Sequence, residues 1–448
     1  MDLVIIGCGS GGISAAKEAL KYTKNILCVD RSPEWIGGVC LNRGCVPTKH
    51  LREGAYLYDR LTLSGIYGFP PLSPLLNLQS AIEGAQTKVI KPIREGIYKF
   101  LRSKGVKFLF SQEVEFLNPS TLRVGSKTVT SKYFLVATGS SPSSVGGISP
   151  DGEFIFDTDN FWEINKTPKK VVIVGGGVSG VEFAYILSRY GAKEIHLIEV
   201  GKTLLPTVEN LSADIVRRLE RTLKGLRIKL HTKTAVEDID KNSQRVKLTS
   251  GELLEEVDAV ILTVGRKPNT HSLGLERIGV SLTQRGHIEV NEKYQTSVEN
   301  VYAVGDVIDT PAFAHVASHE AKLAVRNIFE KTSKRLDYTL VPSVVYSVYE
   351  IGSFGLGEKQ LKAQGVEYKI SNLTFKAVAK ALSEGEEGLI KVFHTPEGRI
   401  LGANVLSKKR SDSILHLLIL AKKGGLDVNG LREIVWAHPT IEEILESL

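Results

Sequence analysis

Short apolar runs alternate with longer amphipathic stretches along the first two-thirds of the chain. The apolar run Leu3–Ile6 is followed by a stretch of helical periodicity to about Tyr22 and by a second apolar run that ends at Asp30. Continuous apolar runs of this length are typical of strands buried on both faces of a parallel sheet. The pattern therefore predicts a strand–helix–strand unit at the start of the chain.

The same unit recurs further along the chain. An apolar run at Lys170–Val174 leads into a helical stretch to about Tyr190 and then a strand that ends at Glu199. Three further apolar runs each lead into a glycine, at Gly139, Gly265 and Gly305. Residues 140–150 are rich in proline, serine and glycine, which predicts a linker.

The pattern changes from about Tyr338 onward. Strands are expected at 341–346 and 388–393, and amphipathic helices at 412–423 and 429–435. This mixture predicts a separate α+β domain at the end of the chain. A chain of 448 residues is also too long for a single compact core.

Each of the two α/β units has a glycine-rich turn between its first strand and its helix. The glycines have GxGxxG spacing, at Gly7, Gly9 and Gly12 in the first turn and at Gly175, Gly177 and Gly180 in the second. Such glycines permit a tight turn and let a pyrophosphate approach the N-terminus of the helix. Asp30 is expected to bind a ribose 2′-hydroxyl, and Glu199 is its counterpart. Two such units exclude a dehydrogenase with one nucleotide cofactor.

Two cysteines, Cys40 and Cys45, stand five positions apart in a glycine-rich stretch. An ideal helix would separate their Cα atoms by about 7.5 Å along its axis, and a disulfide needs about 4.4–6.8 Å. The pair can therefore bridge only where the backbone is distorted, which Gly44 permits. Pro47 predicts a regular helix from Val46 or Pro47, so Cys45 lies at a helix N-terminus that favours its thiolate.

We interpret the cysteine pair as a redox-active disulfide. Two alternatives are two unrelated buried thiols and two of four zinc ligands, for which His50 is a poor third. All four cysteines lie within the first 45 residues, at positions 8, 28, 40 and 45, which does not resemble a secreted disulfide framework.

Composition and charge narrow the picture further. Lysine and arginine number 57 against 50 acids, a net charge of +7, and the two signs are mostly interspersed. This favours a solvated surface over a nucleic-acid site. No apolar run approaches the length of a bilayer-spanning helix, and no signal peptide precedes Leu3. We therefore expect a cytoplasmic protein with no membrane and no nucleic-acid partner.

Taken together, the motifs resemble the pyridine nucleotide–disulfide oxidoreductase family, and within it the dihydrolipoamide dehydrogenase branch. The resemblance runs almost end to end and rests on the segments 7–12, 40–49, 137–139, 175–182, 296–306, 314–317 and 437–443. It implies two Rossmann-like domains, for FAD and NAD, plus a C-terminal α+β dimerisation domain in a homodimer. The domain division is then 1–142 for FAD, 143–268 for NAD, 269–337 completing the FAD domain, and 338–448 for the interface.

The resemblance also implies roles for single residues. Cys45 would face the flavin and Cys40 would exchange with the substrate. Lys49 would lie near the flavin with Glu182 as its partner, and Asp306 would bind the ribityl chain. Other cofactor contacts would be Gly139 and His315 for FAD, and Gly265 for NAD.

By the same resemblance, His438 would be the base for the thiols, held by Glu443 and offered to the disulfide of the other subunit. Two structural alternatives stay open. A lone histidine is more often a packing or surface residue, and Glu443 could close a capping box with Thr440.

Particular residues discriminate among family members. No cysteine follows Cys45, which disfavours relatives with a second thiol pair near the C-terminus. Gly180 and Glu199 favour NAD over NADP, although Lys202 is nearby. Tyr349, the segment 407–410 with its cluster of Lys408, Lys409 and Arg410, and Trp436 depart from the family pattern.

The expected function is an NAD-linked dihydrolipoamide dehydrogenase acting on lipoyl-bearing acyltransferases or carrier proteins. The first alternative is an NAD(P)H-dependent reductase of another small disulfide, similar to glutathione reductase, with the basic cluster contacting an acidic substrate. The second is an FAD-binding structural subunit without turnover.

Overall fold

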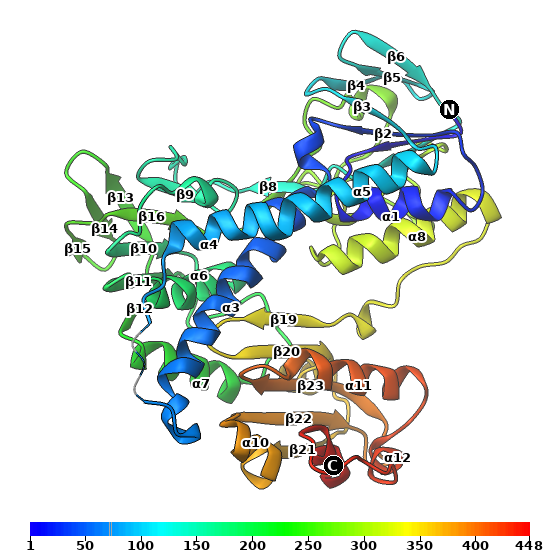
Figure 1. Cartoon of the computed structure of the whole chain (residues 1–448). Coiled ribbons are helices and arrows are strands. Elements are labelled where there is room, and N and C mark those ends of the chain that lie inside the picture. Colours follow the sequence, from blue (N-terminus) through cyan, green and yellow to red (C-terminus); the bar gives the residue numbers. More distant parts are fainter. Residues whose placement is uncertain (71, 73) are drawn as a thin grey trace.

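The computed structural model describes residues 1–70, 72 and 74–448, and three five-stranded sheets organise it (Figure 1). The first sheet is parallel, with the order β18-β7-β1-β2-β3. Its strands are β1 (Leu3–Ile6), β2 (Ile26–Asp30), β3 (Lys107–Phe110), β7 (Tyr133–Val136) and β18 (Val301–Ala303). The predicted first strand–helix–strand unit is confirmed, and Leu3, Val4 and Ile5 are fully buried at its centre.

Helices cover this first sheet. On one face α1 (Ser10–Ala19) lies beside α8 (Ala314–Glu330), as Figure 1 shows. A small antiparallel sheet lies at its edge, made of β4 (Val114–Asn118), β5 (Thr121–Val124) and β6 (Lys127–Thr130). Because β18 and α8 come late in the chain, residues near 300 return to complete a sheet that begins at Leu3.

The second sheet is also parallel and repeats the pattern, with the order β12-β11-β10-β16-β9. Its strands are β9 (Ile155–Asp157), β10 (Lys170–Val174), β11 (Glu194–Glu199), β12 (Ile228–Thr232) and β16 (Ala259–Leu262). The accompanying elements are α6 (Val178–Arg189), α7 (Ala213–Gly225) and the antiparallel strands β13 (Val236–Asp240), β14 (Arg245–Leu248) and β15 (Leu253–Leu254). The second predicted unit is therefore confirmed.

Two chain crossings join these sheets. The strands β8 (Ser140–Pro142) and β17 (Arg266–Pro268) pair antiparallel where the chain enters and leaves the second unit. The prediction of a linker over 140–150 is wrong for its first three residues. They form a strand because their partner, 125 or so positions later, offers backbone groups that local sequence does not reveal.

The third sheet is antiparallel, with the order β19-β20-β23-β22-β21. Its strands are β19 (Ser343–Tyr346), β20 (Glu350–Gly355), β21 (Lys369–Thr374), β22 (Gly388–His394) and β23 (Ile400–Ser407). Its helices are α9 (Glu358–Ala363), α10 (Ala379–Glu384), α11 (Ser411–Lys423) and α12 (Val428–Arg432). The expected α+β segment is present, although α12 ends at Arg432, three residues before the predicted end.

Helices from the first third of the chain run between the three sheets. They are α2 (Gly38–Asn42), α3 (Cys45–Thr62), α4 (Leu78–Gly84), a π-helical turn (Ala85–Ile90) and α5 (Lys91–Ser103). In Figure 1, α3 descends from the first sheet past α6 toward the third sheet. Among the described residues, no helix is both long and apolar enough to cross a membrane.

A buried ion pair fastens α3 to the third sheet. The Arg52 guanidinium lies 3.0 Å from a Glu350 carboxylate oxygen and also donates to the carbonyl oxygen of Lys408. Burial raises the pKa of Glu350 to about 7, against the opposing effect of Arg52. Because this pKa lies above the ordinary value of 4.5, Glu350 stabilises the fold below about pH 4.5 and loses that contribution as pH rises through 7.

The variant Glu350→Gln tests this linkage, because glutamine does not titrate. We expect the urea midpoint of the wild type to decrease, relative to that of the variant, as the pH is raised from about 5 to about 8. The exposed Glu367→Gln serves as a control and should show no such change. A difference in urea midpoint between wild type and Glu350→Gln that stays constant over this pH range would contradict the raised pKa of Glu350.

Candidate active site

The carboxyl ends of both parallel sheets open onto one cleft of about 1890 Å³. Its walls include both glycine turns, both cysteines of the α2–α3 segment and the start of α8. Ligands of open parallel sheets bind at this edge. The structure therefore brings the two predicted nucleotide units and the predicted redox pair together.

The first glycine turn requires glycine at its first and last positions. Gly7 has a φ of +100°, and a Cβ built on Gly12 would lie 1.8 Å from the carbonyl oxygen of Gly7. At Gly9 the constraint is different, because a Cβ there would meet only the Cα atom of Gly38, at 3.5 Å. Packing within the chain does not require a glycine at this position. The missing side chain instead leaves room for a close-lying pyrophosphate, which fits FAD.

The second turn repeats this geometry. Gly175 has a φ of +107°, and a Cβ on Gly180 would lie 1.9 Å from the carbonyl oxygen of Gly175. A Cβ on Gly177 would meet nothing within 4 Å, so its surface is open to the cleft. The second cradle therefore fits a dinucleotide as the first does.

The two strand-end acids have a role that sequence reasoning missed. An Asp30 carboxylate oxygen accepts a hydrogen bond from the backbone N–H of Cys8 at 2.6 Å, and Glu199 accepts from Gly176 at 2.7 Å. In both units the acid therefore holds the second residue of the glycine turn. Both acids also line the cleft, so the predicted ribose contact stays a prediction.

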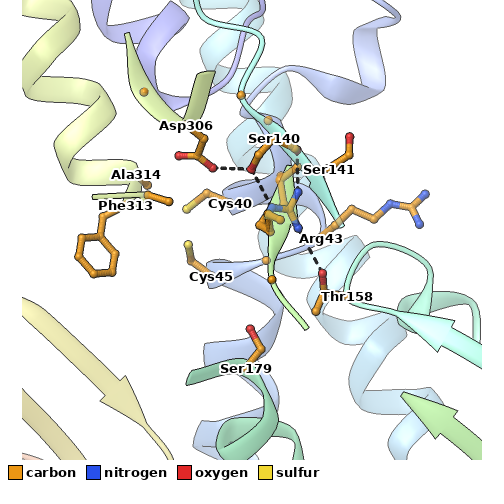
Figure 2. Close-up of a pocket in the computed structure, with 18 of the residues that line it drawn as sticks. Cys40, Arg43, Cys45, Ser140, Ser141, Thr158, Ser179, Asp306, Phe313 and Ala314 are labelled. Carbon is orange, nitrogen blue, oxygen red and sulfur yellow. Dashed lines mark hydrogen bonds between the residues drawn. The ribbon is translucent and has the colours of Figure 1, made fainter. Parts of the chain in front are cut away.

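The chain breaks between the two cysteines, as their spacing requires. Helix α2 ends at Asn42 and α3 begins at Cys45, so Cys45 is the first residue of a helix. A Cβ on Gly44 would approach the carbonyl oxygen of Val39 to 3.1 Å, which shows how tightly the break is packed. In Figure 2 the sulfur atoms of Cys40 and Cys45 turn to the same side of the cleft. Both are free thiols in this structure.

The two thiols have opposite tendencies to ionise. A hydrogen bond from the Cys40 thiol and, to a smaller extent, the positive charge of Lys49 lower the pKa of Cys45 to about 7, against desolvation. The same interaction, with burial, raises the pKa of Cys40 well above its ordinary value. In the reduced pair the proton therefore stays on Cys40 and the negative charge on Cys45.

Lys49 is held one helical turn beyond Cys45. Its Nζ atom lies 2.9 Å from the carboxylate of Glu182, which is only 4% exposed. The backbone N–H of Tyr346 donates to the same carboxylate at 2.9 Å, and Nζ lies 4.8 Å from the centre of the Tyr346 ring. The structure thus brings together the Lys49 and Glu182 pair named from the sequence.

Asp306 belongs to a hydrogen-bonded chain that sequence reasoning missed (Figure 2). The Ser140 hydroxyl donates to an Asp306 oxygen at 2.6 Å and accepts from Nε of Arg266 at 2.8 Å. The only sequence signal was position, because Ser140 follows Gly139 and Arg266 follows Gly265. Gly139 and Gly265 line the cleft with φ values of +67° and +103°.

His315 also lines the cleft, at the start of α8. Its ring stacks on Phe313, and its Nε2 atom lies 3.0 Å from the carbonyl oxygen of Pro342. Burial lowers the pKa of His315, which favours a neutral imidazole. This residue therefore forms part of the cleft wall.

His438 and Glu443 form a pair outside this cleft. Nδ1 of His438 lies 2.8 Å from a Glu443 oxygen, and the His438 side chain is 74% exposed. The Thr440 hydroxyl accepts from the backbone N–H of Glu443, as in a capping box, but the Glu443 carboxylate is directed to the histidine. The single chain does not bring this pair to its own cysteines.

The basic cluster at 408–410 is already paired. The partners are Glu387 for Lys408 at 3.2 Å, Glu53 for Lys409 at 2.6 Å and Glu384 for Arg410 at 3.4 Å. These contacts give the cluster a role within the chain and do not favour its contact with an acidic substrate.

The cleft contains a polarised thiol pair together with two nucleotide cradles, and this arrangement suits the transfer of electrons between thiols and nucleotides. The fold and the cleft therefore define the class of nucleotide-dependent dithiol–disulfide oxidoreductases. Comparison with known families narrows this class. Residues 1–321 match the family model "Pyridine nucleotide-disulphide oxidoreductase" and residues 341–448 match the dimerisation domain of the same family. The chain therefore belongs to the pyridine nucleotide-disulphide oxidoreductase family.

Individual relatives cover the chain from end to end. It is 31% identical to a dihydrolipoyl dehydrogenase of Bacillus subtilis (strain 168), over 99% of this chain and 94% of the relative. It is also 31% identical to a leghemoglobin reductase of Glycine max, over 99% and 86%.

Solved structures agree in fold. The HOCl-induced flavoprotein disulfide reductase RclA from Escherichia coli superimposes with a TM-score of 0.88 at 25% identity, covering 100% of this chain and 99% of that chain. LpdA from Mycobacterium tuberculosis does so with a TM-score of 0.90 at 23% identity, covering 100% and 99%.

These findings confirm the predicted family and its cofactors. The protein is a flavoprotein disulfide oxidoreductase that uses FAD and NAD, and the open glycine cradles fit both groups. The match of the last 108 or so residues to a dimerisation domain supports the predicted homodimer.

The Lys49→Met variant tests the electrostatics of the cysteine pair. Because Lys49 lowers the pKa of Cys45, we expect this pKa to rise by about 1 unit from about 7. The measurement is the pH dependence of alkylation of the reduced protein. An exposed lysine, in Lys91→Met, is the matched control and should leave the profile unchanged. An unshifted profile in Lys49→Met would show that Lys49 does not act on the thiolate.

Proposed function

We propose that this protein is a dihydrolipoyl dehydrogenase that passes electrons between a dithiol substrate, the Cys40–Cys45 pair, FAD and NAD. The observation that carries the proposal is the polarised thiol pair in a cleft shared by two dinucleotide cradles. Similarity to dihydrolipoyl dehydrogenases over the whole chain supports it. The substrates are lipoyl groups on acyltransferases or carrier proteins, and we propose that the reaction takes place in the cytoplasm.

The thiol chemistry has two exchange steps. A substrate thiolate attacks Cys40 of the oxidised pair, so the Cys40–Cys45 bond breaks and Cys45 leaves as a thiolate. The second substrate thiol then attacks the mixed disulfide, which releases the cyclic disulfide product and returns Cys40 as a thiol. Lys49 stabilises the Cys45 thiolate during both steps. The first glycine turn would hold FAD and the second NAD, and the cofactors would supply the transfer of the electron pair from the reduced thiol pair.

Each exchange step needs a base to collect a thiol proton. We assign this role to the partner subunit's His438, which its own Glu443 holds through Nδ1 so that Nε2 is left for the thiol. The exposure of His438 within one chain suits a residue that serves another subunit. We also propose the domain division given above, in which residues 338–448 form the interface between the two subunits.

A second candidate is a reductase of another small disulfide. The similarity to RclA, which is described as a flavoprotein disulfide reductase and is 25% identical to this chain, supports this second candidate. The unusual Tyr349 and Trp436 also lie in the last domain, where a disulfide substrate is expected to approach. Tyr349 is buried beside Arg218, and the Trp436 indole donates to the carbonyl oxygen of Leu431.

Substrate assays distinguish these candidates. We expect dihydrolipoamide and NAD⁺ to yield NADH, with NADP⁺ a poor substitute because Glu199 repels a 2′-phosphate. The comparison is NADPH-driven reduction of a panel of small disulfides. Activity only in the second assay would select the disulfide reductase. Bound FAD with activity in neither would select the structural subunit.

The Cys40→Ser variant tests the division of labour. We expect it to retain FAD and the long-wavelength charge-transfer absorbance of the Cys45 thiolate, and to lose dithiol turnover by several orders of magnitude. The matched variant Cys45→Ser should lose both the absorbance and turnover. Dithiol turnover retained in Cys40→Ser would contradict the assigned roles.

A further inference from the structure

A second cluster of ionisable side chains lies on the second sheet. His196 on β11 and His231 on the neighbouring edge strand β12 face each other, with Nδ1 of His196 2.9 Å from Nε2 of His231. Each histidine has a carboxylate at its other nitrogen, Glu194 at 2.8 Å from His196 and Glu252 at 3.4 Å from His231. None of the four lines the cofactor cleft.

Glu194, His196, His231 and Glu252 form a row, and the positions of its protons follow from its hydrogen bonds. Nε2 of His196 must carry a proton to donate to Glu194, so Nδ1 of His196 is a bare acceptor. Nε2 of His231 then carries the proton between the rings, and Nδ1 of His231 is left bare beside the Glu252 carboxylate. Two acceptors facing each other explain why this last contact is longer. The four side chains therefore lack one positive charge, either a proton or a metal ion, between them.

The charges around the row point the same way. Lys229 at 2.7 Å and Lys170 at 3.5 Å both neutralise Glu194. Within the described residues, Glu252 makes no ion pair other than that with His231. Burial lowers the pKa of both histidines, which keeps the imidazoles neutral and thus in the form that binds metals.

We propose that His196 and His231 form a binding site for a divalent late transition metal, of which Zn²⁺ is the probe. The metal binds Nδ1 of His196 and Nε2 of His231, and the proton of His231 moves from Nε2 to Nδ1, where Glu252 accepts it. Both imidazoles then have a carboxylate behind them, an arrangement that orients metal-binding histidines. One ring nitrogen of each histidine and a carboxylate oxygen of Glu252 lie within 4.8 Å of one another, so the groups that the site needs are already together.

The site needs a small opening to admit the ion. The rings now meet edge to edge, with centroids 5.1 Å apart and planes within 19°. Zinc–nitrogen bonds of about 2.0–2.1 Å require nitrogen atoms about 3.3 Å apart and lone pairs that converge on the metal. His196 is 1% exposed and fixed, but His231 is 14% exposed on an edge strand and can turn outward. Solvent molecules complete the coordination, and Glu252 stays behind His231 as the acceptor of its Nδ1 proton.

The bound metal ties β12 to β11, the strand that ends at Glu199. Oxidised wild-type holoenzyme, dialysed against Zn²⁺, should therefore hold one zinc more than the His231→Asn variant, because the oxidised redox pair does not compete. Its thermal midpoint should rise with Zn²⁺, whereas that of the variant should not. Glu194→Gln should bind zinc about 10–100-fold more weakly, because the carboxylate behind His196 is lost.

The control is His287→Asn, a histidine outside the row, which should bind zinc as the wild type does. Equal zinc content and affinity in wild type and His231→Asn would mean an adventitious ion only and overturn the proposal. If His231→Asn fails to fold, the Glu194→Gln measurement decides. Unchanged zinc affinity in that variant would likewise overturn it. None of these residues belongs to the dithiol machinery, so the dehydrogenase assays are independent of the outcome.

Discussion

The carboxylate of Glu182 is the point at which the three bodies of the molecule meet. It extends from α6 beside the second sheet, binds Lys49 of α3 at 2.9 Å and accepts a hydrogen bond from the backbone N–H of Tyr346 at the end of β19 in the third sheet. A buried carboxylate without such partners would cost several kcal/mol, so the three elements stabilise the charge jointly. Since Cys45 is one turn before Lys49, the same contact fixes where the thiol pair lies relative to both nucleotide cradles.

Both parallel sheets meet the cleft with the same kind of glycine-rich turn. In each, the first and last glycines of the turn are required by close approach of the backbone, and the middle glycine leaves space. An acid from the next strand then holds the second turn residue, at Cys8 or Gly176. Because this turn is repeated, one cleft offers cradles for two elongated ligands, and the thiol pair lines the same cleft.

Features with local causes could be predicted from the sequence, and features with distant causes could not. The strands beginning at Leu3 and Lys170, the glycine turns and a helix start next to Cys45 follow from short-range patterns, although α3 begins at Cys45 itself and not at Val46 or Pro47 as predicted. Strand β8 at Ser140 has no apolar pattern and exists because of backbone bonds to Arg266, Lys267 and Pro268. The pairing of Lys409 with Glu53, 356 positions away, is equally invisible locally. Charge in a sequence predicts an interaction, but not its partner.

The ionisation of the thiol pair explains why a base from outside the chain suits this cleft. In the reduced pair the proton stays on Cys40, whose pKa is raised, and Cys45 carries the charge. Under the proposed roles, Cys40 is the thiol that must exchange, so it needs help to lose that proton. The pKa of His315 is lowered by desolvation, but its Nε2 is directed to the Pro342 carbonyl, which leaves it poorly suited. His438 has its Nδ1 committed to Glu443 and a largely exposed side chain, so under the proposed roles it is the imidazole that suits the task, offered by a second subunit.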